Sequence, residues 1–410
     1  MNNSIGSPPS MSSVRHLCNT IFFCSCQGIY LKQISNIRIV SDMKLAIDAS
    51  RANSVQRTGV ESYAYHVIQE LKRIIPAEVE VVLYTRESLV QDLSDLPNNW
   101  TSKVLAWPPK RLWTQLRLSF EMLLNKPDVL FVPAHVLPIV HPKKSIMTVH
   151  DVAALRFPKA YNWFERWYSV WSATYAARHA TQIITISEFT KKELQSLVSN
   201  ISAEISVIPI ACDDAYKSIA DEQLLESVQK KYAITKPFLL SISRLEFKKN
   251  TDRIVHACNE IKKNHDVQLV LVGKPGHGYK KIEHAIENSP YKKDIIVPGW
   301  VDEEDLVALM NAARVFVFPS LYEGFGIPAL EAMQCGTPVV ASKDTSLEEV
   351  CGDAAIYADR KDAQDIANQM QRLLEDKTLR DRMSIAGEER AQQFSWKLTA
   401  QATWDSLKSL

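Results

Sequence analysis

The stretch from Val315 to Gly336 constrains the fold of this chain more than any other segment. It opens with an apolar run, residues 315–318, which is typical of a strand buried on both faces of a parallel sheet. A glycine-rich loop follows, and Pro328 then suits the first turn of a helix, where its missing N–H costs nothing. Gly336 can end that helix. The stretch therefore predicts a strand–loop–helix unit.

Two carboxylates lie at the ligand-binding end of this unit. Glu323 is in the loop beside Gly324 and Gly326, and Glu331 is predicted in the first helical turn. The glycines let backbone approach a ligand, and the free N–H groups of a helix start favour an anion. Because two carboxylates would repel a bare phosphate, the ligand should also carry hydroxyl groups, as a sugar nucleotide does. The alternative is a tight turn with a solvated glutamate.

Strands and helices alternate along the rest of the chain. A first series of predicted strands covers residues 44–49, 79–84, 128–132, 145–149, 182–186 and 205–210. A second series covers residues 238–243, 268–272, 295–297, 315–318, 338–341 and 355–357. Helical patterns fill the gaps, and the apolar pattern weakens around residues 211–226. This alternation indicates an α/β protein with two parallel sheets.

The bulk composition narrows the class of protein. A net charge of +1 over 410 residues provides no field that would attract nucleic acid. The seven cysteines include no C-x-x-C pair, which argues against zinc and favours a reducing cytosol. No apolar run reaches the roughly 18 residues that span a bilayer. Residues 1–42 are Ser- and Asn-rich, so we expect a disordered extension or an unused upstream start before Met43.

The motif around Glu323 closely resembles the signature of the retaining GT-B glycosyltransferases of glycosyltransferase family 4. That family has two glutamates separated by seven residues around a G-F-G-x-P core, here Glu323 and Glu331 around Gly324, Phe325 and Gly326. The resemblance covers about residues 43–410. It implies two Rossmann-like domains facing a central cleft: an acceptor-side domain over 43–215, a donor-binding domain over 216–394, and a helix over 395–410 that crosses back.

Two cations directly follow the strand predicted at 238–243. Arg244 and Lys249 could neutralise a diphosphate and stabilise its charge as it leaves. Family members have an Arg and a Lys at this spacing, which implies a donor-binding role for both, together with the loop residues 324–326 and Glu331. The side chain of the neighbouring Lys248 is expected to point elsewhere. The alternative is a solvated basic loop.

Two further positions lie where α/β sheets place ligands. His150 ends the strand predicted at 145–149, and the family has a histidine there that contacts the donor sugar. The resemblance therefore implies catalytic roles for His150 and Glu323, although a histidine bound to backbone is the alternative. Gly59 precedes a helix, and in the family this loop lines the acceptor side and approaches the donor. A plain strand–helix connection remains equally open.

Two predicted helices carry apolar stripes at helical spacing. Trp163, Trp167 and Trp171 form one stripe, and Leu112, Leu116 and Phe120 form the other. Such stripes are usually core. The alternative is a peripheral contact with a membrane or a lipid-linked acceptor.

The resemblance implies a retaining glycosyltransferase that needs no cofactor. GDP-mannose is the favoured nucleoside diphosphate sugar donor, and a polysaccharide or lipid-linked glycan is the expected acceptor. A UDP-sugar is the second choice of donor, and an epimerase or a non-catalytic sugar-nucleotide sensor are the rival classes. No D-x-D triplet occurs, which agrees with a metal-independent enzyme. The expected location is the cytoplasm, including the cytosolic face of the membrane.

Overall fold

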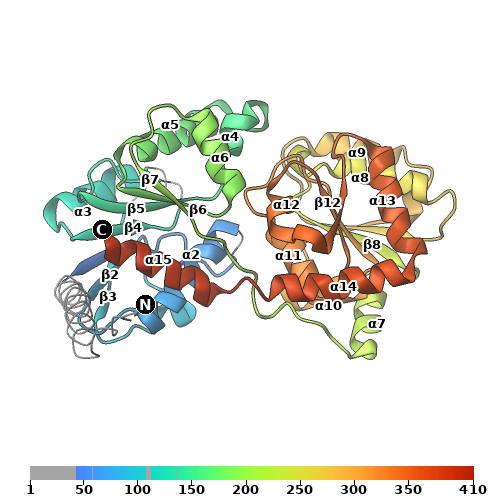
Figure 1. Cartoon of the computed structure of the whole chain (residues 1–410), viewed down its shortest axis with the longest axis horizontal. Coiled ribbons are helices and arrows are strands. Elements are labelled where there is room, and N and C mark those ends of the chain that lie inside the picture. The colour runs from blue at the N-terminus through green and yellow to red at the C-terminus, as the bar shows by residue number, and fades with distance from the viewer. Residues whose placement is uncertain (1–42, 58, 108–111, 135) are drawn as a thin grey trace, which may run out of the picture.

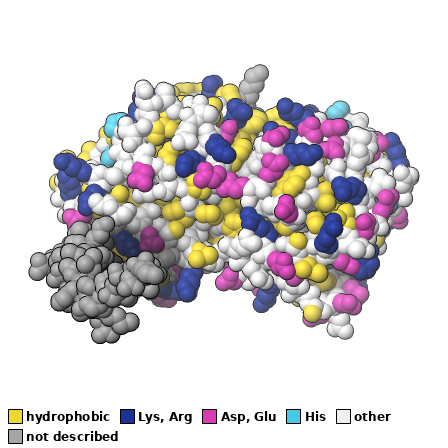
Figure 2. Space-filling view, in the orientation of Figure 1, with side chains coloured by type: hydrophobic (Ala, Val, Ile, Leu, Met, Phe, Trp, Pro, Cys, Tyr) yellow, Lys and Arg dark blue, Asp and Glu magenta, His cyan; other side chains and the backbone are white. Residues whose placement is uncertain are grey.

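The computed structural model describes residues 43–57, 59–107, 112–134 and 136–410. Two parallel sheets lie side by side, each with helices on both faces, and this confirms the predicted fold class (Figure 1). The extension expected at residues 1–42 lies outside the described residues. Figure 2 shows Lys and Arg interspersed with Asp and Glu over the half that contains the second sheet.

The first sheet has seven parallel strands in the order β3-β2-β1-β4-β5-β6-β7. Its central strands are buried Val, Ile, Leu and Ala runs, as expected for a sheet covered on both faces. The short strand β3 was missed by sequence analysis because most of its residues are exposed. The strands are β1 Lys44–Asp48, β2 Glu80–Thr85, β3 Trp100–Val104, β4 Val129–Val132, β5 Lys144–Val149, β6 Gln182–Thr185 and β7 Glu204–Val207.

The helices of this half are held by local caps and by apolar ridges. Helix α2 buries Tyr63, Val67 and Leu71, which recur every four residues. Helix α5 begins with a capping box in which Asn162 and Glu165 satisfy each other's free backbone N–H groups. The helices are α2 Gly59–Ile74, α3 Ser119–Leu124, α4 Ala153–Arg156, α5 Trp163–His179 and α6 Glu188–Leu197.

One predicted helix of this half differs from the expectation. The segment predicted as a continuous helix over 112–124 has a π-helical part, η2 (Thr114–Leu118), before α3. Leu112 has a positive φ of 59°, so the helix cannot start there.

The second sheet has six parallel strands in the order β10-β9-β8-β11-β12-β13. Strand β11 covers Val315–Phe318 as predicted and lies in the middle of the sheet. The strands are β8 Phe238–Ile242, β9 Gln268–Val272, β10 Ile295–Gly299, β11, β12 Val339–Ser342 and β13 Ala355–Ala358. The helices are α7 Glu222–Lys231, α8 Thr251–Ile261, α9 Tyr279–Glu287, α10 Glu303–Ala312, α11 Ile327–Gln334, α12 Ser346–Cys351, α13 Ala363–Glu375 and α14 Lys377–Ala391.

The last helix, α15 (Trp396–Ser409), leaves the second half and lies along α2 of the first (Figure 1). Trp396 and Trp404 are buried, and the indole of Trp396 stacks on His66 with ring centroids 4.8 Å apart. The hydroxyl of Thr399 donates to the carbonyl of Pro209 at 2.7 Å. Packing therefore attaches the end of the chain to the first sheet. None of the described helices is long and apolar enough to span a bilayer.

Removing the buried Trp404 should destabilise the first half of the molecule. Trp404→Ala leaves a cavity between α15 and α2, which typically costs about 3 kcal/mol or more. Urea unfolding followed by circular dichroism measures the change. Leu398→Ala on the same helix is the control, because that side chain is 60% exposed and should change stability by less than about 0.5 kcal/mol. A Trp404→Ala protein as stable as the control would contradict the packing described.

Candidate functional site

Helix α12 holds the loop between β11 and α11 in place by hydrogen bonds. Ser346 donates its hydroxyl to the carbonyls of Glu323 and Phe325, at 2.9 and 3.0 Å. Gly326 has a φ of 107°, and a Cβ there would lie 2.2 Å from the Leu347 side chain. The Phe325 side chain is buried against Phe394, so only its backbone is available to a ligand. Gly326 is therefore required both by its positive φ and by the close approach of Leu347 on α12.

The same loop touches the first half of the molecule through Gly324. A Cβ on this residue would lie 2.0 Å from the carbonyl oxygen of His150, at the end of β5. The carbonyl of Gly324 accepts hydrogen bonds from Ser187 at 2.6 Å and Thr190 at 3.0 Å, both at the start of α6. The strand ends of the two sheets are therefore joined by a backbone contact that only glycine permits.

Lys249 and Glu323 form an ion pair at this junction. The Lys249 ammonium lies 2.6 and 2.8 Å from the two carboxylate oxygens of Glu323. Glu323 is only 8% exposed, so the pair is almost closed to solvent. Removing either partner would leave the other buried without its counter-charge, which is strongly disfavoured.

A cavity of about 600 Å³ lies between the two halves and is lined from both. Arg244 and Lys248 enter it from the second half, and Gly59 lines it from the first. Lys248 therefore does not point away from the site, contrary to the sequence-based expectation. Burial lowers the pKa of Lys248, but the negative charges of Asp151, Glu323 and Glu246 outweigh burial and raise it above the usual range.

Sequence analysis missed several polar residues on the first-half wall of this cavity. Asp48, Arg51, Arg86 and Tyr168 all line it. Burial raises the pKa of Asp48 despite the nearby positive charges of Arg86 and Arg51. Asp48 ends β1 and Arg86 follows β2, so the rule that ligands bind at the carboxyl ends of parallel strands could have found both.

His150 is buried at the same junction, with its ring turned toward backbone. Its Nε2 lies 3.0 Å from the carbonyl oxygen of Pro133, and its ring stands edge-on to Tyr63 with centroids 4.6 Å apart. The ring is not among the groups that line the cavity. The carbonyl oxygen of His150 is the atom that approaches the glutamate loop.

Glu331 lies apart from Glu323, in a different electrostatic environment. It is the fifth residue of α11, one position beyond the first turn in which it was predicted. Desolvation, with the negative charges of Glu303 and Asp213, raises the pKa of Glu331 to about 8. Asp213 in turn is 3.1 Å from Nε2 of His66 on α2. Three carboxyl groups around one position suit a ligand that donates hydroxyl hydrogen bonds. Among the described residues, no group of three or more His, Cys, Asp or Glu is arranged to hold a metal ion.

Two parallel α/β sheets whose strand ends meet at a charged cavity are the GT-B architecture. The family model described as Glycosyltransferase Family 4 matches residues 57–216, and the model described as Glycosyl transferases group 1 matches residues 226–390. The chain belongs to glycosyltransferase family 4. The two matches leave little of the described chain uncovered.

Named relatives and solved structures agree with this assignment. O-antigen chain mannosyltransferase B of Escherichia coli is 28% identical over 377 residues, which cover 86% of this chain and 96% of that protein. Serotype-specific mannosyltransferase WbdA of Escherichia coli is 28% identical over 63% of this chain, which spans only 32% of WbdA. The structure of Anabaena Alr3699/HepE in complex with UDP-glucose superposes with a TM-score of 0.70 at 18% identity, covering 90% of this chain and all of that one.

The raised pKa of Glu331 predicts a pH-dependent stability in the absence of ligand. Between about 4.5, its ordinary value, and about 8, the folded protein holds a proton that the unfolded chain has released. This group's contribution to stability therefore falls as pH rises through that window. Glu331→Gln removes the titrating group, so the variant does not lose this stability. The melting temperature of the variant minus that of the wild type should therefore rise up to about pH 8 and then level off.

The measurement is thermal unfolding across that pH range without nucleotide. Glu287→Gln, a change of an exposed glutamate on α9, is the control and should give a constant difference. A constant difference for Glu331→Gln as well would contradict the proposed desolvation.

Proposed function

We propose that this enzyme transfers a mannosyl group from GDP-mannose to a polysaccharide or lipid-linked glycan, with retention at the anomeric carbon. The observation that carries the proposal is that Arg244 and Lys248 line the inter-domain cavity, while the next residue, Lys249, forms an ion pair with Glu323. A diphosphate needs such cations, and a sugar needs a carboxylate within reach. The choice of mannose is supported by the O-antigen mannosyltransferase that matches this chain over nearly its full length.

The diphosphate of the donor is placed against Arg244 and Lys249, after β8. Negative charge on the leaving nucleoside diphosphate grows as the bond from the anomeric carbon to oxygen breaks. Fixed cations therefore stabilise the transition state more than the ground state, without a metal ion. Glu331 is assigned to the ribose hydroxyls and Glu323 to the sugar, with the backbone of residues 324–326 around it.

The acceptor is placed on the opposite wall of the cavity, near Gly59. Its hydroxyl attacks the anomeric carbon on the face from which the diphosphate departs, through an oxocarbenium-like state. A new carbon–oxygen bond replaces the one to phosphate, and the hydroxyl proton passes to the leaving phosphate oxygen. His150 is assigned to the donor sugar, and its carbonyl is the atom nearest the glutamate loop.

A donor assay tests the proposal against its alternatives. Purified protein is incubated with labelled GDP-mannose or UDP-glucose, with and without cell-envelope acceptor, and with EDTA. We expect acceptor-dependent transfer from GDP-mannose that EDTA does not abolish. Transfer from UDP-glucose but not from GDP-mannose would favour the second choice of donor. Anabaena Alr3699/HepE has UDP-glucose in its solved complex. Conversion of donor without acceptor would indicate an epimerase, and binding without turnover a sensor.

Removing either phosphate cation should damage catalysis more than binding. Arg244→Ala and Lys249→Ala should each lower single-turnover transfer about a hundredfold, because each removes a preorganised contact with the leaving group. Donor affinity, measured by calorimetry, should fall much less. Lys280→Ala is the matched control, since Lys280 is exposed on α9 and is not among the residues that line the cavity.

Lys248→Ala distinguishes two positions for the diphosphate. Because Lys248 lines the cavity with Arg244, this change is a test and not a control. If Lys248→Ala alone is damaging and Lys249→Ala is silent, the diphosphate lies against Lys248 and the role of Lys249 is only to pair with Glu323. If Arg244→Ala, Lys248→Ala and Lys249→Ala all match Lys280→Ala, the phosphate site lies elsewhere.

A further inference from the structure

The linker that joins the two halves, residues 208–221, is attached to the second half by side-chain hydrogen bonds. The side-chain oxygen of Asn311 on α10 accepts the backbone N–H of Ile219 at 2.8 Å. Further back in the linker, the Cys212 thiol donates to the side-chain oxygen of Gln334 on α11. The linker is therefore held on both of these helices.

The first half holds the same linker through His66 on α2. The Nε2 atom of His66 lies 3.1 Å from Oδ2 of Asp213. The other carboxylate oxygen of Asp213 accepts the backbone N–H of Ala215 at 2.8 Å, so the orientation of this carboxylate is fixed. Because Asp213 immediately follows Cys212, the contact to α2 and the contact to α11 lie on adjacent residues of the linker.

The second connection between the halves reaches His66 as well. Trp396 begins α15, the helix with which the chain returns to the first half (Figure 1). Its indole stacks on the imidazole of His66 with an interplanar angle of 8°. The His66 side chain is 20% exposed and Trp396 is buried, so the stack is largely closed to solvent. The linker and the start of α15 therefore meet at one histidine.

The helix α11, to which Cys212 is bonded, also carries Glu331. Gln334 follows Glu331 by three positions, so the two side chains project from the same side of α11. Burial, followed by the charges of Glu303 and Asp213, raises the pKa of Glu331. The hydrogen bond with His66 lowers the pKa of Asp213 and so favours its charged form. The position of Asp213 therefore bears directly on the carboxyl group that is assigned to the ribose.

We propose that His66 is a positioning residue of the nucleotide site. It holds Asp213 and the adjoining linker against α11, and in this way it sets the Glu331 carboxyl for the ribose hydroxyls. His66 belongs to the first half, whereas the nucleotide is assigned to the second. Nucleotide affinity therefore depends on how the two halves are held together. This inference rests on the assignment of Glu331 to the ribose in the proposed function.

Two variants separate the hydrogen bond of His66 from its stacking. His66→Phe keeps a ring against Trp396 but has no atom that can donate to Asp213. His66→Gln keeps an N–H donor at the distance of Nε2 but loses the ring. A residue that only packs against Trp396 would tolerate phenylalanine, whereas a positioning residue that acts through Asp213 would tolerate glutamine. Melting temperatures verify that each variant folds.

Calorimetry with the full chain measures the affinity for GDP and, separately, for UDP. We expect His66→Phe to weaken binding of the better nucleotide about three- to tenfold, the range that one net hydrogen bond contributes. His66→Gln should bind like wild type. In an Asp213→Ala background, His66→Phe should cause no further loss, since its partner is already gone. His256→Phe is the matched control, because His256 is exposed on α8, and it should change nothing.

The rate at saturating donor gives a second readout. Because Glu331 is assigned to the ribose and not to the reacting carbon, single-turnover transfer at saturating donor should be unchanged in His66→Phe. Unchanged nucleotide affinity in His66→Phe, or a loss in His66→Gln as large as in His66→Phe, would overturn this inference alone. So would a lower saturated rate with unchanged affinity. Wild-type protein that binds neither nucleotide would overturn the proposed function and this inference together.

Discussion

The approach of Gly324 to the carbonyl of His150 is the contact on which the rest of the site depends. A Cβ at Gly324 would lie 2.0 Å from that oxygen, so any other residue would push the loop away from β5. The hydroxyls of Ser187 and Thr190 then hold the Gly324 carbonyl, and the Glu349 carboxylate accepts two backbone N–H groups at the start of α6. These bonds bring together the carboxyl ends of two sheets. The cavity, its cations and Glu323 are all positioned by that junction.

The two glutamates of one motif have opposite electrostatic surroundings. Glu323 is nearly buried but faces the ammonium of Lys249, so a negative charge is stabilised there. Glu331 faces Glu303 and Asp213, so burial and repulsion favour its protonated form. Eight positions along the chain therefore separate a charged carboxylate beside the cavity from a carboxyl that is ready to exchange hydrogen bonds with hydroxyls. A sugar nucleotide suits both carboxyl groups, because it carries the sugar at one end and ribose hydroxyls toward the other.

Local sequence patterns predicted the fold and the glycine-rich loop. The features that the sequence did not predict depend on contacts between segments that are distant in the chain. Strand β11, the glycine loop and the alternation of strands and helices are encoded in short windows of sequence. The position of Lys248 is not encoded in such a window. The short turn over Phe247–Lys249 and the left-handed φ of 62° at Asn250 set the directions of Lys248 and Lys249. Asp48 and Arg86 meet the cavity only through the order of strands in the sheet. The orientation of His150 likewise depends on Pro133, which lies 17 residues away in the chain.

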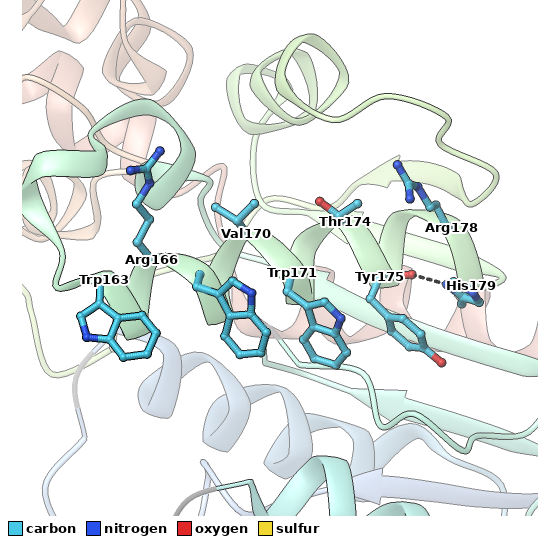
Figure 3. A pocket seen from close by; sticks show the side chains of 9 residues that line it. Trp163, Arg166, Val170, Trp171, Thr174, Tyr175, Arg178 and His179 are labelled. Carbon is cyan, nitrogen blue, oxygen red and sulfur yellow. Dashed lines mark hydrogen bonds between the residues drawn. The ribbon is translucent and has the colours of Figure 1, made fainter.

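The periodicity of α5 shows why a stripe alone does not identify a core. Only Ser172, Ala176 and Ala177 of this helix are buried, so small residues and not the tryptophans form its contact with the first sheet. The capping box at Asn162 stabilises the helix start by local hydrogen bonds. The rings divide between two surfaces: Phe164 and Tyr168 line the cavity, and Trp163 and Trp167 lie outside. The cavity wall and the outer ring row, which Figure 3 shows, are therefore two faces of one helix.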